Sequence, residues 1–373
     1  MGLQNNLGAV RRFAALRRFA SWLQGIPNRV TPPPFRLMEI GSAFWQSRAL
    51  YVATRLDLAS SLGDDALPVA EIAARVSAHP DTAYRLLRML AAMGIFQEVS
   101  PGVFKNNTLS SYLREDNPKN VRAMILMHNS TEMSRPWYEQ LEQGVRTGDI
   151  PFRLAHGLDL FAYMDDHPEF DALFCRAMDS VEALLGDSFA TDFDWGQFRR
   201  VIDIGGSRGS KAVALLKRHP HLKALVVDRA HVVEGAPQYW AGRETATVLE
   251  RLSFQAGDLF ASVPAASDEK DIYLVSAVLH GFDDDTCIEI LRNLANASAG
   301  TGARIALLEL VVADVHADLT SAAFDMQMFI GTNGRERTLS QWRRLFDQSQ
   351  LVLEEEVGLQ SFGKILVLRQ VNE

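Results

Sequence analysis

The sequence is poor in cysteine and in net positive charge. Its 373 residues include two cysteines, Cys175 and Cys287, whose wide separation fits neither a disulfide framework nor a metal-binding spacing. The net charge of −8 disfavours nucleic-acid binding, which needs clustered positive charge. No uncharged apolar run is long enough to cross a bilayer. We therefore expect a cytoplasmic protein without a metal site, a nucleic-acid partner or a stable membrane association.

The chain is organised around a glycine-rich segment at residues 200–209, Arg-Val-Ile-Asp-Ile-Gly-Gly-Ser-Arg-Gly. A short apolar strand leads into the glycines, and a helical pattern starts near Ser210. A phosphate-binding P-loop would need a lysine where Ser210 stands, and a dinucleotide fingerprint would need glycine in place of Ser207 and Ser210. Both interpretations therefore fail.

An acid on the strand and a second acid at the end of the next apolar run favour S-adenosylmethionine, which has an amino acid end and a ribose but no phosphate. We expect Gly205 and Gly206 to let the backbone approach the methionine part. Asp203 can attract its ammonium group, and Asp228 can accept hydrogen bonds from the ribose hydroxyls. A glycine-rich turn that binds a different ligand remains the alternative.

The length exceeds one typical domain, and we divide the chain into four parts. Residues 1–34 form a basic amphipathic helix ended by Pro27 and the prolines 32–34, which we interpret as an arm on a partner subunit rather than a membrane-surface or transit segment. Residues 35–117 contain a helix-turn-helix and a wing, with Asp81 as the cap of the second helix. Residues 118–190 are helical, and residues 191–373 form the cofactor domain.

The cofactor domain is predicted to be α/β, with a mostly parallel sheet and an antiparallel C-terminal edge. Several strands are apolar at consecutive positions, as is typical of a sheet covered on both faces. Ligands of such sheets lie beyond the carboxyl ends of the strands. Strands are expected at 200–204, 223–228, 252–256, 271–277 and 303–309, followed by two more around 351–354 and 365–368.

Five segments together resemble the plant and bacterial S-adenosylmethionine-dependent O-methyltransferases, the family of caffeic acid and hydroxyindole O-methyltransferases. The resemblance covers roughly residues 35 to 370. It implies a Rossmann-like catalytic domain preceded by a winged-helix domain that forms a homodimer. The segments are Val201–Gly209, Val227–Val233, Gly257–Phe260, Val278–Asp284 and Asn333–Thr338.

The resemblance also assigns roles. It makes His280 the general base that takes the proton of the acceptor hydroxyl, with Glu309 and Glu336 as the acids that flank it. Asp258 and Leu259 would border the adenine, and Ser276 stands where plant members carry a lysine. Four apolar residues match positions that line the acceptor pocket, namely Phe170, Phe174, Met178 and Met328.

The chain departs from the family pattern after the histidine, where Gly281 and Phe282 replace the usual Asp-Trp and remove a carboxylate that orients the acceptor. We predict an O-methyltransferase for a phenolic or other hydroxylated, largely apolar small molecule of specialised metabolism. Three alternatives stay open. They are methylation of nitrogen, carbon or sulfur, a cofactor-binding enzyme that does not methylate, and a DNA-binding regulator that uses Arg85 and Arg88.

Overall fold

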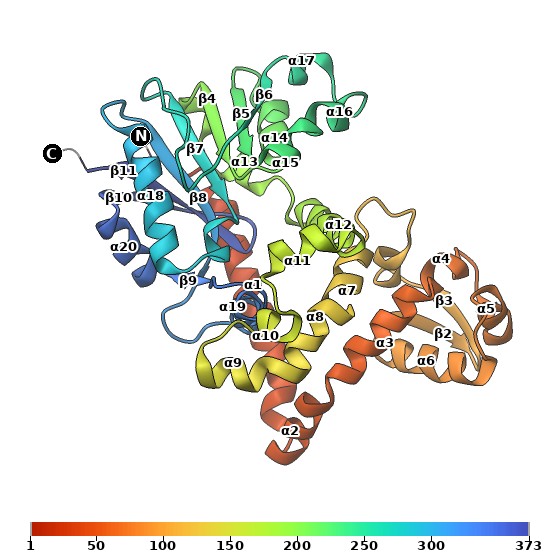
Figure 1. Ribbon diagram of the computed structural model, residues 1–373. Helices are drawn as coiled ribbons and strands as arrows, with labels where there is room; N and C mark the ends of the chain where they lie inside the picture. The colour runs from red at the N-terminus through yellow and green to blue at the C-terminus, as the bar shows by residue number, and fades with distance from the viewer. Residues whose placement is uncertain (1, 372–373) are drawn as a thin grey trace. The chain divides into compact units, whose positions relative to one another are not determined.

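The computed structural model describes residues 2–371 (Figure 1). The chain divides into two compact units. One contains the start of the chain up to Arg18 together with the residues from Leu185 onward, and the other contains Phe19–Leu184. Within the described range, no helix is long and apolar enough to span a membrane.

The larger unit is built on a mixed sheet in the order β10-β11-β8-β7-β4-β5-β6, with β9 paired to β8. The neighbours from β6 to β8 are parallel, whereas β11 runs antiparallel to β8 and β10 antiparallel to β11. This confirms the predicted fold class. The strands are β4 Arg200–Ile204, β5 Lys223–Asp228, β6 Leu252–Ala256, β7 Asp271–Ser276, β8 Arg304–Val312, β9 Arg337–Thr338, β10 Leu351–Gly358 and β11 Gly363–Gln370.

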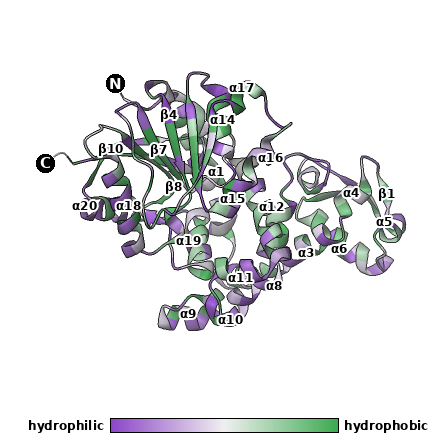
Figure 2. Cartoon of the chain, turned by 45° about the horizontal axis from the view of Figure 1, so that its top comes forward, coloured by the Kyte–Doolittle hydropathy of each residue, from purple (hydrophilic) through white to green (hydrophobic). Residues whose placement is uncertain are grey.

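Helices cover both faces of this sheet, and each face has its own apolar core. Val201 of β4 and Ile272 of β7 belong to one core, while their neighbours Ile202 and Tyr273 belong to the other. Figure 2 shows apolar residues along β4, β7 and β8 at the centre of the sheet. The helices are α13 Ser188–Asp192, α14 Ser210–Arg218, α15 Ala230–Glu234, α16 Ala236–Trp240, α17 Ala246–Leu249, α18 Asp284–Ser298, α19 Leu319–Gly331 and α20 Leu339–Gln348, with 3-10 turns η3 Trp195–Gln197 and η4 Leu279–Gly281.

The start of the chain packs on the larger unit. Leu3 is buried, its backbone N–H donates to Glu355, and Asn5 donates to the carbonyl of Asp192. Helix α1, Leu7–Val30, follows. The expectation that Pro27 ends this helix was wrong, because Pro27 lies inside it. Proline removes one backbone donor, but its fixed φ is helical, so the chain can complete a last turn.

The smaller unit contains the predicted helix-turn-helix and wing. Helices α5 Val69–Arg75 and α6 Pro80–Ala92 precede a hairpin of β2 Phe96–Ser100 and β3 Val103–Asn106, and β1 Leu67–Pro68 adds a third strand. Asp81 is not the cap, since α6 starts one residue earlier at Pro80, a residue favoured in the first turn. Asp81 instead pairs with Arg85 at 3.0 Å, and Arg88 lies over the ring of Tyr84.

The remaining helices of the smaller unit flank this motif. The residues before it form three separate helices, α2 to α4. The residues after it contain the predicted helical region, which ends with the long α12. The helices are α2 Pro33–Ser42, α3 Phe44–Arg55, α4 Leu58–Leu62, α7 Arg122–His128, α8 Thr131–Arg135, α9 Leu141–Thr147, α10 Pro151–His156, α11 Leu160–Asp166 and α12 Pro168–Leu185, with a 3-10 turn η1 Ser110–Leu113 and a π-helical turn η2 Pro136–Gln140.

Candidate active site

Four parallel strands of the larger unit end at one edge of the sheet, and polar residues follow each of them. Register aligns Ile204 of β4 with Val227 of β5 and Val275 of β7, so Gly205, Asp228 and Ser276 come next at the same level. Asp228 in turn aligns with Ala256 of β6, which leads to Asp258 and Leu259. The structure therefore gathers the predicted cofactor residues at the carboxyl ends of the strands, where α/β sheets bind ligands.

The glycines at this edge leave space that no other residue could leave. A Cβ on Gly206 would lie 2.5 Å from the carboxyl group of Asp203, which is 1% exposed at the end of β4. Gly205 has a φ of +69°, and a Cβ there would lie 2.7 Å from the side chain of Val278. Gly205 requires glycine for its backbone conformation, and both positions require it for close approach.

Asp228 shapes the glycine-rich turn as well as the edge. Its carboxylate accepts hydrogen bonds from the backbone N–H of Ser207 at 2.8 Å and of Arg229 at 2.7 Å. Ser207 adopts a φ of +53°, which is unusual for a residue with a side chain. Asp228 thereby holds a strained turn closed across the ends of two strands.

This edge fits S-adenosylmethionine. The glycines form a cradle packed directly against Asp203 and Val278, where a Cβ would clash, and the carboxylates of Asp203 and Asp228 beside it would suit the ammonium and the ribose of the cofactor. The site does not need the backbone N–H groups and the lysine of a phosphate-binding P-loop, because this cofactor has no phosphate. Asp203, Gly205, Gly206 and Asp228 are the residues that would hold it.

His280 sits in the short turn η4, directly beyond β7. Glu309 of the neighbouring strand β8 stabilises the entry to this turn, because its Oε1 accepts the backbone N–H of Val278 at 3.2 Å and of Leu279 at 3.0 Å. The side chain of Glu309 is 2% exposed. A residue of the sheet core thus sets the position of the histidine.

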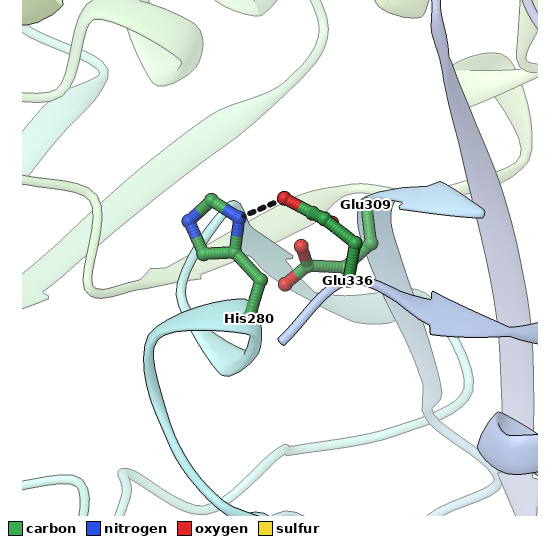
Figure 3. Close-up of side chains that lie close together, drawn as sticks. All are labelled: His280, Glu309 and Glu336. Carbon is green, nitrogen blue, oxygen red and sulfur yellow. Dashed lines mark hydrogen bonds and ion pairs between the residues drawn. The ribbon is translucent and has the colours of Figure 1, made fainter. Parts of the chain in front are cut away.

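Glu336 binds the imidazole itself. Its Oε1 lies 2.8 Å from Nδ1 of His280, and Figure 3 shows the other ring nitrogen, Nε2, on the side of the ring away from both glutamates. His280, Glu309 and Glu336 are therefore brought together as predicted. Among the described residues, the second carboxylate oxygen of each glutamate is buried without a hydrogen-bond partner.

The two acids change the proton affinity of the ring. Burial by itself lowers the pKa of His280, but the hydrogen bond to Glu336 and the negative charges of both glutamates outweigh burial and raise the pKa to about 9. Burial raises the pKa of Glu309 to about 7, and the charge of Glu336 adds to this increase. The site therefore binds protons more tightly than its separate groups would in water.

The same three side chains offer ligand atoms within 4.8 Å of one another, a spacing that could hold a metal ion. Two of these atoms, however, already form the hydrogen bond between the ring and Glu336. A carboxylate on one imidazole nitrogen selects the tautomer in which the other nitrogen can accept a proton. We therefore interpret the cluster as an acid–base site.

The predicted acceptor residues fall in two different units. Met328 lies on α19 of the larger unit, partly buried. The other three lie on α12 of the smaller unit, where Phe170 is buried, Phe174 is partly buried and Met178 is 37% exposed. Phe170 packs with Phe152 and Met164 in an apolar cluster.

Two residues near the histidine have roles that sequence reasoning missed. A Cβ on Gly334 would lie 1.9 Å from the carbonyl oxygen of His280, and Arg337 is fully buried against the same turn. A glycine and an arginine on either side of Glu336 were visible in the sequence. Only the fold shows that the segment touches the turn that carries His280, 56 residues away from Glu336.

Two family models match the chain. The O-methyltransferase domain matches residues 138–350, and the O-methyltransferase dimerisation domain matches residues 38–116. Among curated proteins, the phenazine O-methyltransferase of Lysobacter antibioticus is 31% identical over 335 residues, which cover 90% of this chain and 96% of that protein.

Solved structures agree with this result. An O-methyltransferase from neocarzinostatin biosynthesis, in complex with S-adenosylmethionine and 2-hydroxy-5-methyl naphthoic acid, superposes with a TM-score of 0.72 at 27% identity, covering 87% of this chain and 96% of its own. An N,N-8-amino-8-demethyl-D-riboflavin dimethyltransferase from Streptomyces davawensis superposes with a TM-score of 0.75 at 25% identity. The match covers 91% of this chain and 99% of that one.

The glycine cradle yields a first prediction. Gly206→Ala places a methyl group against the carboxyl group of Asp203, and relieving such a clash costs about 1–3 kcal/mol. We expect affinity for S-adenosylmethionine and its demethylated product to fall about 10-fold or more in isothermal titration calorimetry. The matched control is Gly235→Ala, where no atom lies within 4 Å and φ is −84°. Equal affinity of the two variants would contradict the close approach.

Proposed function

Because the chain belongs to the O-methyltransferase family and depends on S-adenosylmethionine as that family does, we propose that it methylates a hydroxyl group of a flat aromatic small molecule with His280 as the general base. The observation that carries this proposal is the imidazole held by Glu336 at one nitrogen, with the other nitrogen turned away from both acids (Figure 3). The proposed acceptor class also draws on the phenazine and naphthoic acid named for two similar proteins.

The chemistry requires little more than position and a base. When bound, S-adenosylmethionine would supply a methyl group activated by its positively charged sulfur, and it would leave as the neutral thioether when the carbon–sulfur bond breaks. The protein must orient the acceptor and make its oxygen nucleophilic. A phenol has a pKa of about 10, so an imidazole can accept its proton as the new oxygen–carbon bond forms. In this proposal, the O–H bond breaks towards Nε2 of His280.

The glutamates stabilise the charge that this step creates. Glu336 keeps the proton of the neutral ring on Nδ1, so the lone pair of Nε2 is available. Once His280 is protonated, the negative charge of Glu336 offsets the imidazolium, as in other histidine–acid pairs. Glu309 acts on the backbone of the turn and limits how far the ring can move.

We propose that aromatic and methionine side chains contact the acceptor ring, among them Met328 of α19 in the unit that carries His280. Aromatic and methionine side chains suit a flat ligand, because they offer large and polarisable contact areas. Gly281 follows the histidine without a side chain, so in this proposal the acceptor needs no carboxylate partner at that position.

Nitrogen methylation is the second candidate, because a riboflavin dimethyltransferase is among the similar structures. A neutral amine is nucleophilic without a base, so that reaction makes no use of the His280–Glu336 pair, which favours oxygen. Incubation with methyl-labelled S-adenosylmethionine and matched panels of phenols, amines and thiols separates the candidates. Label on amines alone would refute the proposal.

The match to a dimerisation domain supports a homodimer, and exposed apolar side chains give it a surface. Phe35, Leu37, Met38 and Ile40 of α2 and Trp45 of α3 expose 60% to 70% of their area. Exposed apolar side chains gathered on short helices in this way are typical of interaction sites. We propose that a second copy of the chain covers it, together with exposed Phe19 and Trp22 of the basic helix α1.

Loss of His280 tests the general base. We expect His280→Ala to lower kcat about 10²- to 10⁴-fold, the usual contribution of such a group, while calorimetry shows unchanged cofactor affinity. His221→Ala, at an exposed histidine of the same unit, is the matched control and should keep full activity. Full turnover by His280→Ala on the identified acceptor would refute the assignment.

The pH profile tests the Glu336 bond. Because the pKa of His280 is raised above 6.5, kcat/KM should increase with pH through a limb above that value. The side chain of Glu336→Gln still accepts the hydrogen bond from Nδ1–H of His280 but carries no charge. The rising limb of the kcat/KM profile should therefore move to lower pH. Glu356→Gln, in a surface pair with Lys364, should leave the limb unchanged. A limb that stays in place in Glu336→Gln would contradict the coupling.

The dimer can be tested by introducing negative charges into its proposed surface. Met38→Glu with Ile40→Glu would bury charges at the proposed interface, which is strongly unfavourable. We expect light scattering to show the mass of two chains for the native protein and of one chain for this variant. The control is Val145→Glu on α9, which is 67% exposed but lies outside the matched dimerisation range. A dimeric double variant would overturn the proposed surface.

A further inference from the structure

Arg337 is a buried arginine that the proposed reaction does not use directly. It is the first residue of β9, and none of its side-chain surface is exposed. The guanidinium lies over the ring of Trp342, 5.1 Å from its centroid. A buried cation is costly unless its donors are satisfied, so its hydrogen bonds indicate what it is there to hold.

The donors of Arg337 reach both ends of the turn that carries His280. Nη1 donates to the carbonyl oxygen of Leu279 at 3.1 Å, and Nη2 donates to that of Phe282 at 2.8 Å. These two carbonyls bracket His280 and Gly281. Nε donates to Asp284 at the start of α18, at 2.9 Å. One planar group therefore fixes the turn relative to the following helix.

The neighbours of Arg337 in sequence hold the same turn. Gly334 lies against the carbonyl oxygen of His280, Glu336 binds its ring, and Asn333 donates to Asp283, the cap of α18. The segment 333–337 thus contacts the backbone before, at and after the histidine. Any shift of this segment must move the imidazole.

Charge is the second property of Arg337. Two buried carboxylates raise the proton affinity of His280, and the positive guanidinium opposes them, lowering the pKa of the ring. Without this opposition the ring would hold its proton to a still higher pH than its pKa of about 9 implies. The charged or titratable groups around the histidine come from four elements and one loop, and they are Glu309, Glu336, Arg337, Asp283, Asp284, Cys287 and Asp325.

We propose that Arg337 is a positioning residue for methyl transfer, which fixes the turn of His280 at both ends and offsets the negative charge of the two glutamates around the imidazole. This proposal rests on the proposed role of His280 as the base. It adds a residue that acts through the histidine and touches neither the cofactor nor the acceptor.

The test separates position from charge with three variants. Arg337→Gln removes the charge, Arg337→Lys keeps the charge but not the planar fork of donors, and Asp284→Asn removes a negative charge at a half-exposed site. Arg304→Gln is the matched control. It loses a paired arginine on β8, five residues from Glu309 along the same strand.

The first readout is the titration of His280 by NMR in the cofactor-bound protein, which needs no turnover. We expect the midpoint to rise by about 0.5 to 1 unit in Arg337→Gln, because a nearby positive charge is lost. It should fall by about 0.2 to 0.5 unit in Asp284→Asn, where solvent screens part of the effect. It should stay unchanged in Arg337→Lys and Arg304→Gln.

The second readout is kcat. We expect Arg337→Lys to lose about 10- to 100-fold in kcat with little change in KM for the cofactor, because small displacements of a catalytic group cost rates of this order. Asp284→Asn carries the charge test alone if Arg337→Gln does not fold. Opposite shifts of the His280 titration midpoint in Arg337→Gln and Asp284→Asn are not expected from a purely structural defect.

Two results would overturn the proposal. One is an unchanged His280 midpoint in both Arg337→Gln and Asp284→Asn, and the other is native kcat in Arg337→Lys. Failure of the proposed function looks different, since His280→Ala would then keep full turnover while the midpoint in Arg337→Gln still moved. The two hypotheses can therefore fail separately.

Discussion

The hydrogen bond between Nδ1 of His280 and Oε1 of Glu336 is the contact on which the proposed chemistry depends. It joins residues 56 positions apart, at 2.8 Å, in a site whose acids are almost fully buried. In such surroundings a negatively charged carboxylate needs a positive charge or a hydrogen-bond donor nearby. The charges of the ring, the two glutamates and Arg337 are therefore coupled to one another. The tautomer, orientation and proton affinity of the imidazole all follow from that balance.

The sheet provides the rigid frame for this balance. Glu309 extends from β8, His280 follows β7, and the proposed cofactor edge begins at β4, so three adjacent strands supply the proposed base, its support and the proposed donor site. Parallel neighbours end at the same level, which makes the edge a natural meeting point for residues from distant parts of the sequence. The glycines matter because they let backbone and ligand approach there.

Much of this could be predicted from local pattern. The apolar strands, the glycine-rich turn and Asp228 were visible because a strand, a tight turn and a helix each have a short-range signature. Local signals were also where errors arose. Pro27 continues a helix that it was expected to end, and Asp81 lies inside the first turn rather than before it. A neighbouring proline outweighed the capping preference of the aspartate. The positions of helix ends are set by small free energies that tertiary contacts readily exceed.

The sequence by itself determined the class of fold and the cofactor chemistry, because both depend on residue types at short, regular spacing, and it indicated the family through five segments that resemble it. Only the tertiary structure decided which distant groups meet. Gly334 and Arg337 have no distinctive local pattern, yet one lies against the carbonyl of His280 and the other donates to the carbonyls on either side of it. Contacts between backbone carbonyls and buried side chains leave little trace in composition or periodicity, since any residue supplies the carbonyl and only the fold brings it within hydrogen-bonding distance.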